Sequence, residues 1–179
     1  GAAQSVPSTA NMNPFLNLTS LASGQPVSSI RPGYLITDGS VTIGMTSALT
    51  QNFAFVKLTP NTTMPSEVWN AATMTVSAGG ATGTGTILQD SGINYMFLTP
   101  PAGAVLQTAA CPIPPGGKNC IVSASNTQIS IYLPGQSTPQ PAFYTFTTGT
   151  TGNLLQPNVV DVVGGSAVYV NTGREFFEG

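Results

Sequence analysis

Short runs of alternating apolar and polar residues recur along the chain, a period of two that is typical of β-strands with one buried face. The pattern is clearest over residues 73–77, 128–133 and 142–147. No segment carries a long apolar repeat at the 3.6-residue period of a helix, so we expect few and short helices. The pattern predicts an all-β, antiparallel domain.

Turn residues between these runs predict which strands are neighbours. Asp38-Gly39 stands between 34–37 and 40–44, a strong signal for a β-hairpin in which Asp38 is a turn residue. The strands at 128–133 and 142–147 are the next expected hairpin. Further strands are predicted at 53–58, 159–165 and 167–170.

Composition separates the first residues from the rest of the chain. Residues 1–30 are rich in Ser, Pro, Asn and Ala, and we expect them to form an extended N-terminal lead-in or linker. Residues 31–179 carry the strand signals and are numerous enough for a single domain with a hydrophobic core. No repeat of about 20 to 50 residues is present, which argues against a solenoid or a propeller.

Charged residues are few and apolar runs are short, and these two features argue against nucleic-acid binding and against a membrane span. Charged residues make up 6% of the chain, against about 25% in a typical soluble domain. The cations are scattered and form no basic patch, so nucleic acid is not an expected partner; they are Arg31, Lys57, Lys118 and Arg174. No apolar run approaches the ~20 residues of a membrane-spanning helix, so no membrane span is expected.

The two cysteines, Cys111 and Cys120, flank a segment rich in Pro and Gly. A metal site would need further Cys or His ligands, and the chain has no His. We therefore expect a disulfide between them, with no metal and no cofactor. Disulfides are typical of oxidising compartments, so the expected protein is secreted or periplasmic.

Asp90 is the strongest candidate for chemistry because it lies in the most apolar run of the chain, residues 84–98. A carboxylate among apolar residues must be hydrogen-bonded, paired or functional. A second interpretation stays open, since Asp-Ser-Gly is common in tight turns and Ser91-Gly92 would supply the bend. The missing His excludes Ser-His-Asp and Cys-His catalysis, so hydrolysis would depend on carboxylates, Lys or hydroxyls.

Several segments, in the same order, resemble the C-terminal lobe of pepsin-like aspartic peptidases. Residues 67–76 and the glycine-rich turn after them are similar to the paired strands before the catalytic loop of that lobe. Residues 85–92, Gly-Thr-Ile-Leu-Gln-Asp-Ser-Gly, are similar to the loop itself. Residues 129–146 look like its unit of apolar strand, glycine turn and returning strand, and 173–177 stand where the family has a glycine and a final helix. The resemblance covers residues 33 to 179 and implies a pepsin-like β lobe with few short helices.

The resemblance also implies a catalytic role for Asp90, Ser91 and Gly92. Asp90 would share a proton with a second carboxylate, one acting as base on a water and the other as acid toward the carbonyl of a peptide substrate. Ser91 would hydrogen-bond across the pair, and Gly92 would donate its N–H to the carboxylate. Because the chain has one such loop, the second carboxylate would come from a second lobe of the same protein or from a homodimer mate. The isolated chain, expected to be one lobe of a larger protein, would be inactive.

Some positions depart from the family pattern, and two other functions stay open. The departures are at Gln89, Asn94 and Asn171-Thr172, where the family mostly has apolar residues or a supporting Ser or Thr.

One alternative is a non-catalytic, peptidase-like binding or structural module of the cell envelope. The other is an unrelated surface or adhesin domain rich in Thr, Gly and Asn, for which composition is the argument.

Overall fold

The computed structural model describes residues 31–37, 39–53, 55–63, 69–112, 119–133 and 142–178. The chain divides into two compact units, one of Gly1–Phe53 and Leu58–Asn70 and one of Ala54–Lys57 and Ala71–Gly179. The predicted lead-in at 1–30 lies outside the described residues, as does Asp38, so both predictions stay predictions.

The first unit contains a two-stranded antiparallel hairpin of β1 (Arg31–Thr37) and β2 (Ser40–Met45). The hairpin predicted from the Asp-Gly turn is confirmed, with Thr37 paired to Ser40. One helical turn follows, α1 (Ser47–Thr50), and the Thr46 hydroxyl caps it by accepting the N–H of Leu49 at 3.2 Å.

The strand predicted at 53–58 is wrong. The described residues of that range belong to no strand, and the side chains of Phe53 and Phe55 are exposed. Val56 packs against the core of the second unit instead. An apolar run becomes a strand only where a neighbouring strand satisfies its backbone N–H and C=O groups, and this run has no such neighbour among the described residues.

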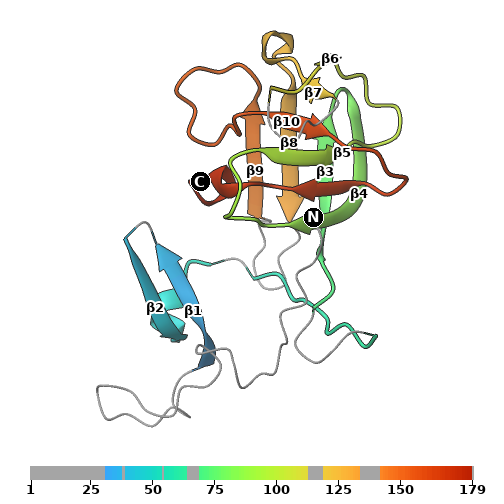
Figure 1. Cartoon of the computed structure of the whole chain (residues 1–179). Coiled ribbons are helices and arrows are strands. Elements are labelled where there is room, and N and C mark those ends of the chain that lie inside the picture. Colours follow the sequence, from blue (N-terminus) through green and yellow to red (C-terminus); the bar gives the residue numbers. More distant parts are fainter. Residues whose placement is uncertain are drawn as a thin grey trace. The chain divides into compact units, whose positions relative to one another are not determined.

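The second unit is built on a nine-stranded mixed sheet (Figure 1). In chain order the strands are β3 (Ala72–Ala78), β4 (Ala81–Leu88), β5 (Met96–Thr99), β6 (Thr108–Ala109), β7 (Cys120–Ile121), β8 (Gln128–Leu133), β9 (Ala142–Thr147), β10 (Val160–Val162) and β11 (Tyr169–Asn171). Across the sheet they lie in the order β6-β7-β10-β5-β11-β4-β3-β8-β9. The all-β prediction is confirmed, as is the hairpin of β8 and β9.

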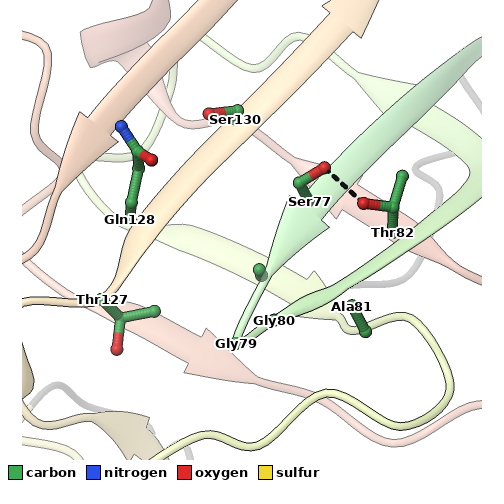
Figure 2. A pocket seen from close by; sticks show the side chains of 9 residues that line it. Ser77, Gly79, Gly80, Ala81, Thr82, Thr127, Gln128 and Ser130 are labelled. Atoms are coloured by element: carbon green, nitrogen blue, oxygen red, sulfur yellow. Dashed lines mark hydrogen bonds between the residues drawn. The ribbon is translucent and has the colours of Figure 1, made fainter.

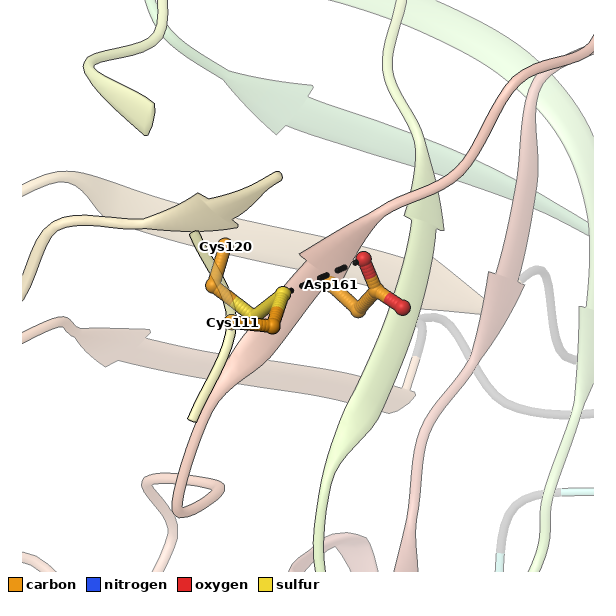
Figure 3. A group of neighbouring side chains, drawn as sticks. All are labelled: Cys111, Cys120 and Asp161. Atoms are coloured by element: carbon orange, nitrogen blue, oxygen red, sulfur yellow. Dashed lines mark hydrogen bonds between the residues drawn. A yellow bond between two sulfur atoms is a disulfide. The ribbon is translucent and has the colours of Figure 1, made fainter. Parts of the chain in front are cut away.

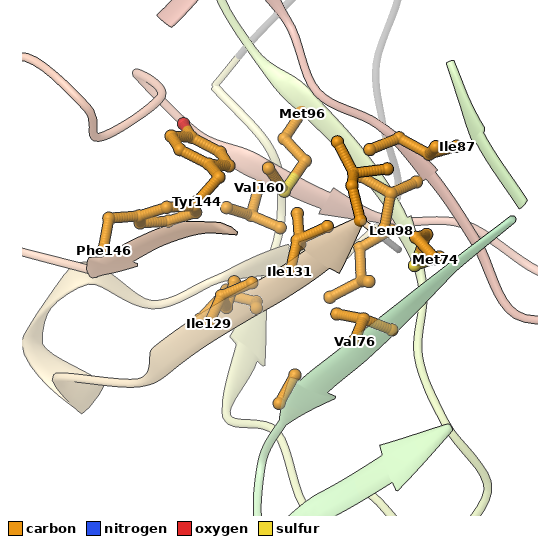
Figure 4. Packing of buried hydrophobic residues seen from close by; sticks show 14 of the residues in the cluster. Met74, Val76, Ile87, Met96, Leu98, Ile129, Ile131, Tyr144, Phe146 and Val160 are labelled. Atoms are coloured by element: carbon orange, nitrogen blue, oxygen red, sulfur yellow. The ribbon is translucent and has the colours of Figure 1, made fainter. Parts of the chain in front are cut away.

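Alternating side chains of the long strands build the core of this unit (Figure 4). On β3, Met74 and Val76 are fully buried while Thr73 faces solvent, as the period-two pattern predicts. β8 and β9 alternate in the same way. Their buried residues pack against strands from the other half of the sheet, and these core residues are Ile129, Ile131, Tyr144, Phe146, Met96, Leu98, Val160 and Val170.

β11 lies between β4 and β5 and is hydrogen-bonded to both, parallel to β4 and antiparallel to β5. β10 is likewise parallel to β5, so the sheet is mixed rather than purely antiparallel. Parallel pairing requires a long connection, and β10 and β11 come late in the chain, far from the strands that they join. As a result, β4 and β5 are separated by a third strand and do not form a hairpin.

Glycines on the inner side of β4 let the chain before β11 come close. A Cβ at Gly85 would lie 1.9 Å from the carbonyl oxygen of Val168, and a Cβ at Gly83 would lie 3.2 Å from a methyl group of Val168. The same Val168 oxygen accepts the N–H of Thr86 at 3.1 Å. The Thr-Gly alternation over 82–86 therefore fixes where β11 enters the sheet.

Helices are few and short, as the sequence predicts. Besides α1, the described residues form the 3₁₀ turns η3 (Ser123–Ser125) and η4 (Arg174–Glu178). None of the helices in the described ranges has the length and hydrophobicity needed to cross a bilayer.

The predicted disulfide between Cys111 and Cys120 is confirmed. Cys111 follows β6, and Cys120 is the first residue of β7, so the bond links the ends of two paired strands at the edge of the sheet. Disulfides are typical of proteins outside the cytoplasm.

Candidate functional site

The Asp90 loop connects β4 to β5 and lies where three strands meet. β4 ends at Leu88, β5 begins at Met96, and β11 between them ends at Asn171. Asp90 is therefore not on a hairpin tip, because the strands that flank its loop pair with β11 rather than with each other. Its position depends on segments about 80 residues apart in the sequence, which the hydrogen bond between Asn171 and Asp90 joins.

Both oxygens of the Asp90 carboxylate accept an N–H hydrogen bond. Oδ1 accepts the backbone N–H of Gly92 at 2.8 Å, and Oδ2 accepts the side-chain N–H of Asn171 at 3.0 Å. Asn171 is itself held, because its Oδ1 accepts the backbone N–H of Gly173 at 3.2 Å. Two donors from opposite sides fix the plane of the carboxylate.

Backbone hydrogen bonds tie the end of β11 to both sides of the loop. Thr172 donates its N–H to Leu88 O at 3.0 Å, and Arg174 donates to Ile93 O at 2.8 Å. Gly173 lies between them with φ of +69°, and a Cβ there would come within 2.6 Å of Tyr95 O. Glycine is required at this position, because another residue would both strain the backbone and push the loop away from β11.

The surroundings of Asp90 are partly apolar and partly open. Asp90 is half-buried, whereas Ser91 and Gly92 are exposed and Leu88 is 48% exposed. Within the described ranges the Ser91 hydroxyl makes no hydrogen bond. Burial raises the pKa of the Tyr169 phenol, the charge of Asp90 raises it further, and a hydrogen bond with Asn171 lowers it.

The sequence brought three of the residues of this site together and missed the fourth. Asp90, Ser91 and Gly92 lie on one loop, and the hydrogen bond implied between the Gly92 N–H and the carboxylate is present. The same bond occurs in ordinary Asx turns, so it does not by itself assign a catalytic role. Asn171 was noted only as a departure from a family pattern. Its signal in the sequence is an Asn-Thr pair directly after the apolar run 167–170; both residues are buried at the end of β11, and buried polar groups require hydrogen-bond partners.

Replacing Asn171 with Asp is expected to create a coupled pair of carboxyl groups. The new carboxyl would take the place of an amide nitrogen that lies 3.0 Å from Asp90 Oδ2. Two carboxylates this close cannot both ionise easily, so the pKa of one of them should rise well above the usual value of about 4. NMR titration of the side-chain carboxyl carbons measures this. Asn94→Asp is the control, since no side-chain hydrogen bond of Asn94 occurs in the described chain; an ordinary single titration in Asn171→Asp would contradict the geometry.

A second carboxylate, Asp161 on β10, is buried away from the Asp90 loop and is 4% exposed. Burial raises the pKa of the Asp161 carboxyl, and a hydrogen bond from the backbone N–H of Asn119 lowers it. In the described part of the chain no Lys or Arg forms an ion pair with it. Asp161 is therefore a destabilising charge whenever it is ionised.

Replacing Asp161 with Asn is expected to stabilise the oxidised protein at neutral pH by about 1 kcal/mol. A carboxyl whose pKa is raised by folding binds its proton more tightly in the folded chain, so the free energy of unfolding falls as the pH rises from the ordinary value of 3.8 through the raised one. The gain from the substitution should shrink as the pH is lowered toward 3.8. Urea denaturation at several pH values measures it, and a gain independent of pH would contradict burial as the cause.

Glu175, in η4, is another buried carboxylate. Its Oε1 lies 3.5 Å from the Nε of the exposed Arg174, and its Oε2 has no hydrogen-bond partner among the described residues. Burial first and the charge of Glu175 second raise the pKa of Tyr144, whose hydroxyl donates to the carbonyl oxygen of Leu155. Glu175 of the final turn therefore lies near Tyr144 of β9.

A pocket of about 400 Å³ lies at the opposite end of β4 from Asp90 (Figure 2). With a rise of about 3.3 Å per residue, β4 extends about 23 Å between the pocket and the start of the Asp90 loop. Its lining carries hydroxyls, one amide and no titratable group; the lining residues are Ser77, Ala78, Gly79, Gly80, Ala81, Thr82, Thr127, Gln128 and Ser130. The pocket therefore belongs to a different part of the surface from the Asp90 site.

The candidate site thus consists of one oriented carboxylate, Asp90, its two N–H donors from Gly92 and Asn171, and the exposed hydroxyl of Ser91. It offers an acid or base and a hydroxyl donor at the surface of a rigid β scaffold. No family model, no curated protein and no solved structure matches the chain.

Proposed function

We propose that the chain is one half of an aspartic peptidase, in which Asp90 activates the water that attacks a peptide carbonyl. The observation that carries the proposal is the setting of Asp90, half-buried at the ends of three hydrogen-bonded strands with an N–H donor on each oxygen. A general base must be held in one orientation and be reachable by the water that it deprotonates. This carboxylate meets both needs.

The reaction requires a second carboxyl group, which a partner half would supply. In the described chain the hydrogen-bond partners of Asp90 are Gly92 and Asn171, neither of which can donate an acidic proton to a leaving group. The Ser91 hydroxyl, which makes no hydrogen bond within the described ranges, would hydrogen-bond to the partner and fix the distance between the carboxyl groups. The partner is a second lobe of the same protein or a second copy of this chain.

The surface next to Asp90 supports an extended, largely uncharged peptide as substrate. Leu88 offers an exposed apolar side chain two residues before Asp90. Gln89 lies between them and can hydrogen-bond to a peptide backbone. The disulfide supports a secreted or periplasmic location, where such a peptidase would meet its substrates.

The experiment is cleavage of a mixture of fluorogenic peptides at acidic pH. It uses the longest polypeptide that the gene encodes and, in parallel, this chain over a wide range of concentrations. A rate per mole that rises with the concentration of this chain identifies a second copy as the partner, whereas activity confined to the longer polypeptide identifies a second lobe. Cleavage that survives in Asp90→Asn, or no cleavage by either protein, would overturn the proposal.

The hydrogen bond from Asn171 favours a second candidate, a peptidase-like module that binds peptides or other proteins without cleaving them. The side-chain amide of Asn171 donates to Asp90 Oδ2, where a catalytic pair would have a second carboxyl group, and an amide cannot exchange a proton with the carboxylate. In such a module Asp90 would accept hydrogen bonds from a bound chain. Peptide binding without cleavage, weakened by Asp90→Ala, would support this candidate over the first.

A further inference from the structure

Asp161 lies against the disulfide, in a cluster that the Asp90 site does not use (Figure 3). Its Oδ1 is 3.5 Å from Cys111 Sγ. A disulfide sulfur carries no proton, so this is a contact in the oxidised protein and can become a hydrogen bond only when Cys111 is a thiol. The sulfurs of Cys111 and Cys120 and one carboxylate oxygen of Asp161 all lie within 4.8 Å of one another.

We propose that Cys111, Cys120 and Asp161 form a redox-gated metal site, which binds one thiophilic divalent cation such as Zn²⁺ after the disulfide is reduced. The sequence argues against a metal because the chain has no His and no further Cys to act as ligands. The fold supplies the missing ligand from a strand 41 positions after Cys120 in the chain, since Asp161 is paired directly with Cys120. The oxidised protein has no such site, because its sulfurs are bonded to each other.

Adjacent strands hold two of the ligands, Cys120 and Asp161, and Cys111 follows a third strand, so their arrangement does not depend on the disulfide alone. Cys120 and Asp161 are opposite each other in the antiparallel pair of β7 and β10, where the Cβ atoms lie about 5 Å apart. Val162 strengthens this pair by donating its N–H to Asn119 O at 2.7 Å. Cys111 lies two residues after the end of β6, which is hydrogen-bonded to the other edge of β7.

The distances suit a tetrahedral ion. With metal–sulfur bonds of about 2.3 Å and metal–oxygen bonds of about 2.0 Å, a sulfur and an oxygen ligand lie about 3.5 Å apart and two sulfurs about 3.8 Å apart. The distance between Cys111 Sγ and Asp161 Oδ1 already has this value. The two Cα atoms of the cysteines are 4.9 Å apart, which lets both sulfurs point at one ion once their bond is broken. Water would complete the coordination.

The chemistry explains why a carboxylate is buried beside a disulfide. A dithiol reductant gives two electrons and two protons to the disulfide, producing the thiols of Cys111 and Cys120 and becoming a disulfide itself. A divalent cation then displaces the two thiol protons and forms two metal–sulfur bonds and one bond to Asp161. The two thiolates neutralise the ion, and the carboxylate, a cost to the oxidised protein, becomes its third ligand and is no longer a buried charge without a cation beside it.

The test is a titration of the whole chain with Co²⁺ and then with Zn²⁺, after reduction by a phosphine, which itself becomes a phosphine oxide. We expect the reduced protein to bind one Co²⁺ with the intense absorption of tetrahedral thiolate coordination, which Zn²⁺ then displaces. The oxidised protein should show no such absorption. Asp161→Asn should bind about tenfold more weakly or worse, and the double variant Cys111→Ser, Cys120→Ser should not bind.

A second measurement keeps the proposal testable if reduction loosens the fold. Alkylation of the two thiols by iodoacetamide should slow when Zn²⁺ is added to the reduced protein, and should slow much less in Asp161→Asn. The proposal would be overturned if the reduced parent protein and reduced Asp161→Asn had equal affinity for Co²⁺ and if Zn²⁺ protected their thiols equally from alkylation. Binding of less than one equivalent, or thiolate absorption in the oxidised protein, would also overturn it.

Discussion

Replacing Asp90 with Asn in the assembled protein is expected to lower kcat/KM for peptide cleavage by about 10⁴-fold. The side chain keeps its size, and its remaining carbonyl oxygen can still accept the N–H of Gly92. An amide cannot take a proton from water, however, so the substitution removes the base. It also places an amide nitrogen against the side-chain N–H of Asn171, so the hydrogen bond between these two side chains is lost, while the backbone hydrogen bonds of Thr172 and Arg174 still hold the loop. The measurement is the rate of cleavage at saturating and at low peptide concentration, which separates kcat from KM.

The control for this prediction is another carboxylate on the same chain. Glu178 is exposed at the end of η4, and Glu178→Gln removes one negative charge without touching the Asp90 loop. It should leave kcat/KM within about twofold of the parent protein, because an exposed charge has weak effects at a distance. A similar loss in both variants would mean that net charge, rather than the base, governs the reaction.

Replacing Gly85 with Ala is expected to destabilise the second unit by about 3 kcal/mol or more. The new methyl group would lie 1.9 Å from Val168 O, a backbone atom that cannot rotate away. Relief would require β11 to move away from β4 and to lose the hydrogen bond between Thr86 and Val168. Since β11 ends at Asn171, the same movement should weaken the hydrogen bond to Asp90.

Gly164→Ala is the matched control for the steric argument. A Cβ at Gly164 would meet no atom within 4 Å, and its backbone does not adopt a positive φ. Denaturant unfolding should therefore show a change of about 0.5 kcal/mol or less for Gly164→Ala. If Gly85→Ala were equally mild, the close approach of β11 to β4 would be wrong.

Local pattern was sufficient to predict the hairpins, and it failed where pairing is decided at a distance. The alternation in β8 and β9 and the Asp-Gly turn after β1 are local signals, and both hairpins form. The run at 53–58 has the same apolar character but no strand beside it among the described residues. The parallel pairing of β11 with β4 joins segments about 80 residues apart. A period-two pattern predicts that a segment is a strand but not which distant strand it pairs with.

The candidate site was likewise predictable from local sequence, but its contacts with distant segments were not. Asp90 stood out because a carboxylate in an apolar run needs partners, and the loop supplies one of them from Gly92. The other donor, Asn171, and the contact of Asp161 with the disulfide both come from strands that are distant in sequence. These two contacts exist only because the order of the sheet places β11 beside β4 and β10 beside β7.

The most direct test compares the affinities of two peptides that differ at one residue, measured by calorimetry with the assembled protein. One is an ordinary extended peptide, and the other carries a statine-type hydroxyl that mimics the tetrahedral transition state of hydrolysis. A peptidase should bind the mimic about 100-fold more tightly or better, and Asp90→Asn should abolish the preference. Equal affinity for the two peptides would contradict catalysis at Asp90 and would identify the chain as a binding module.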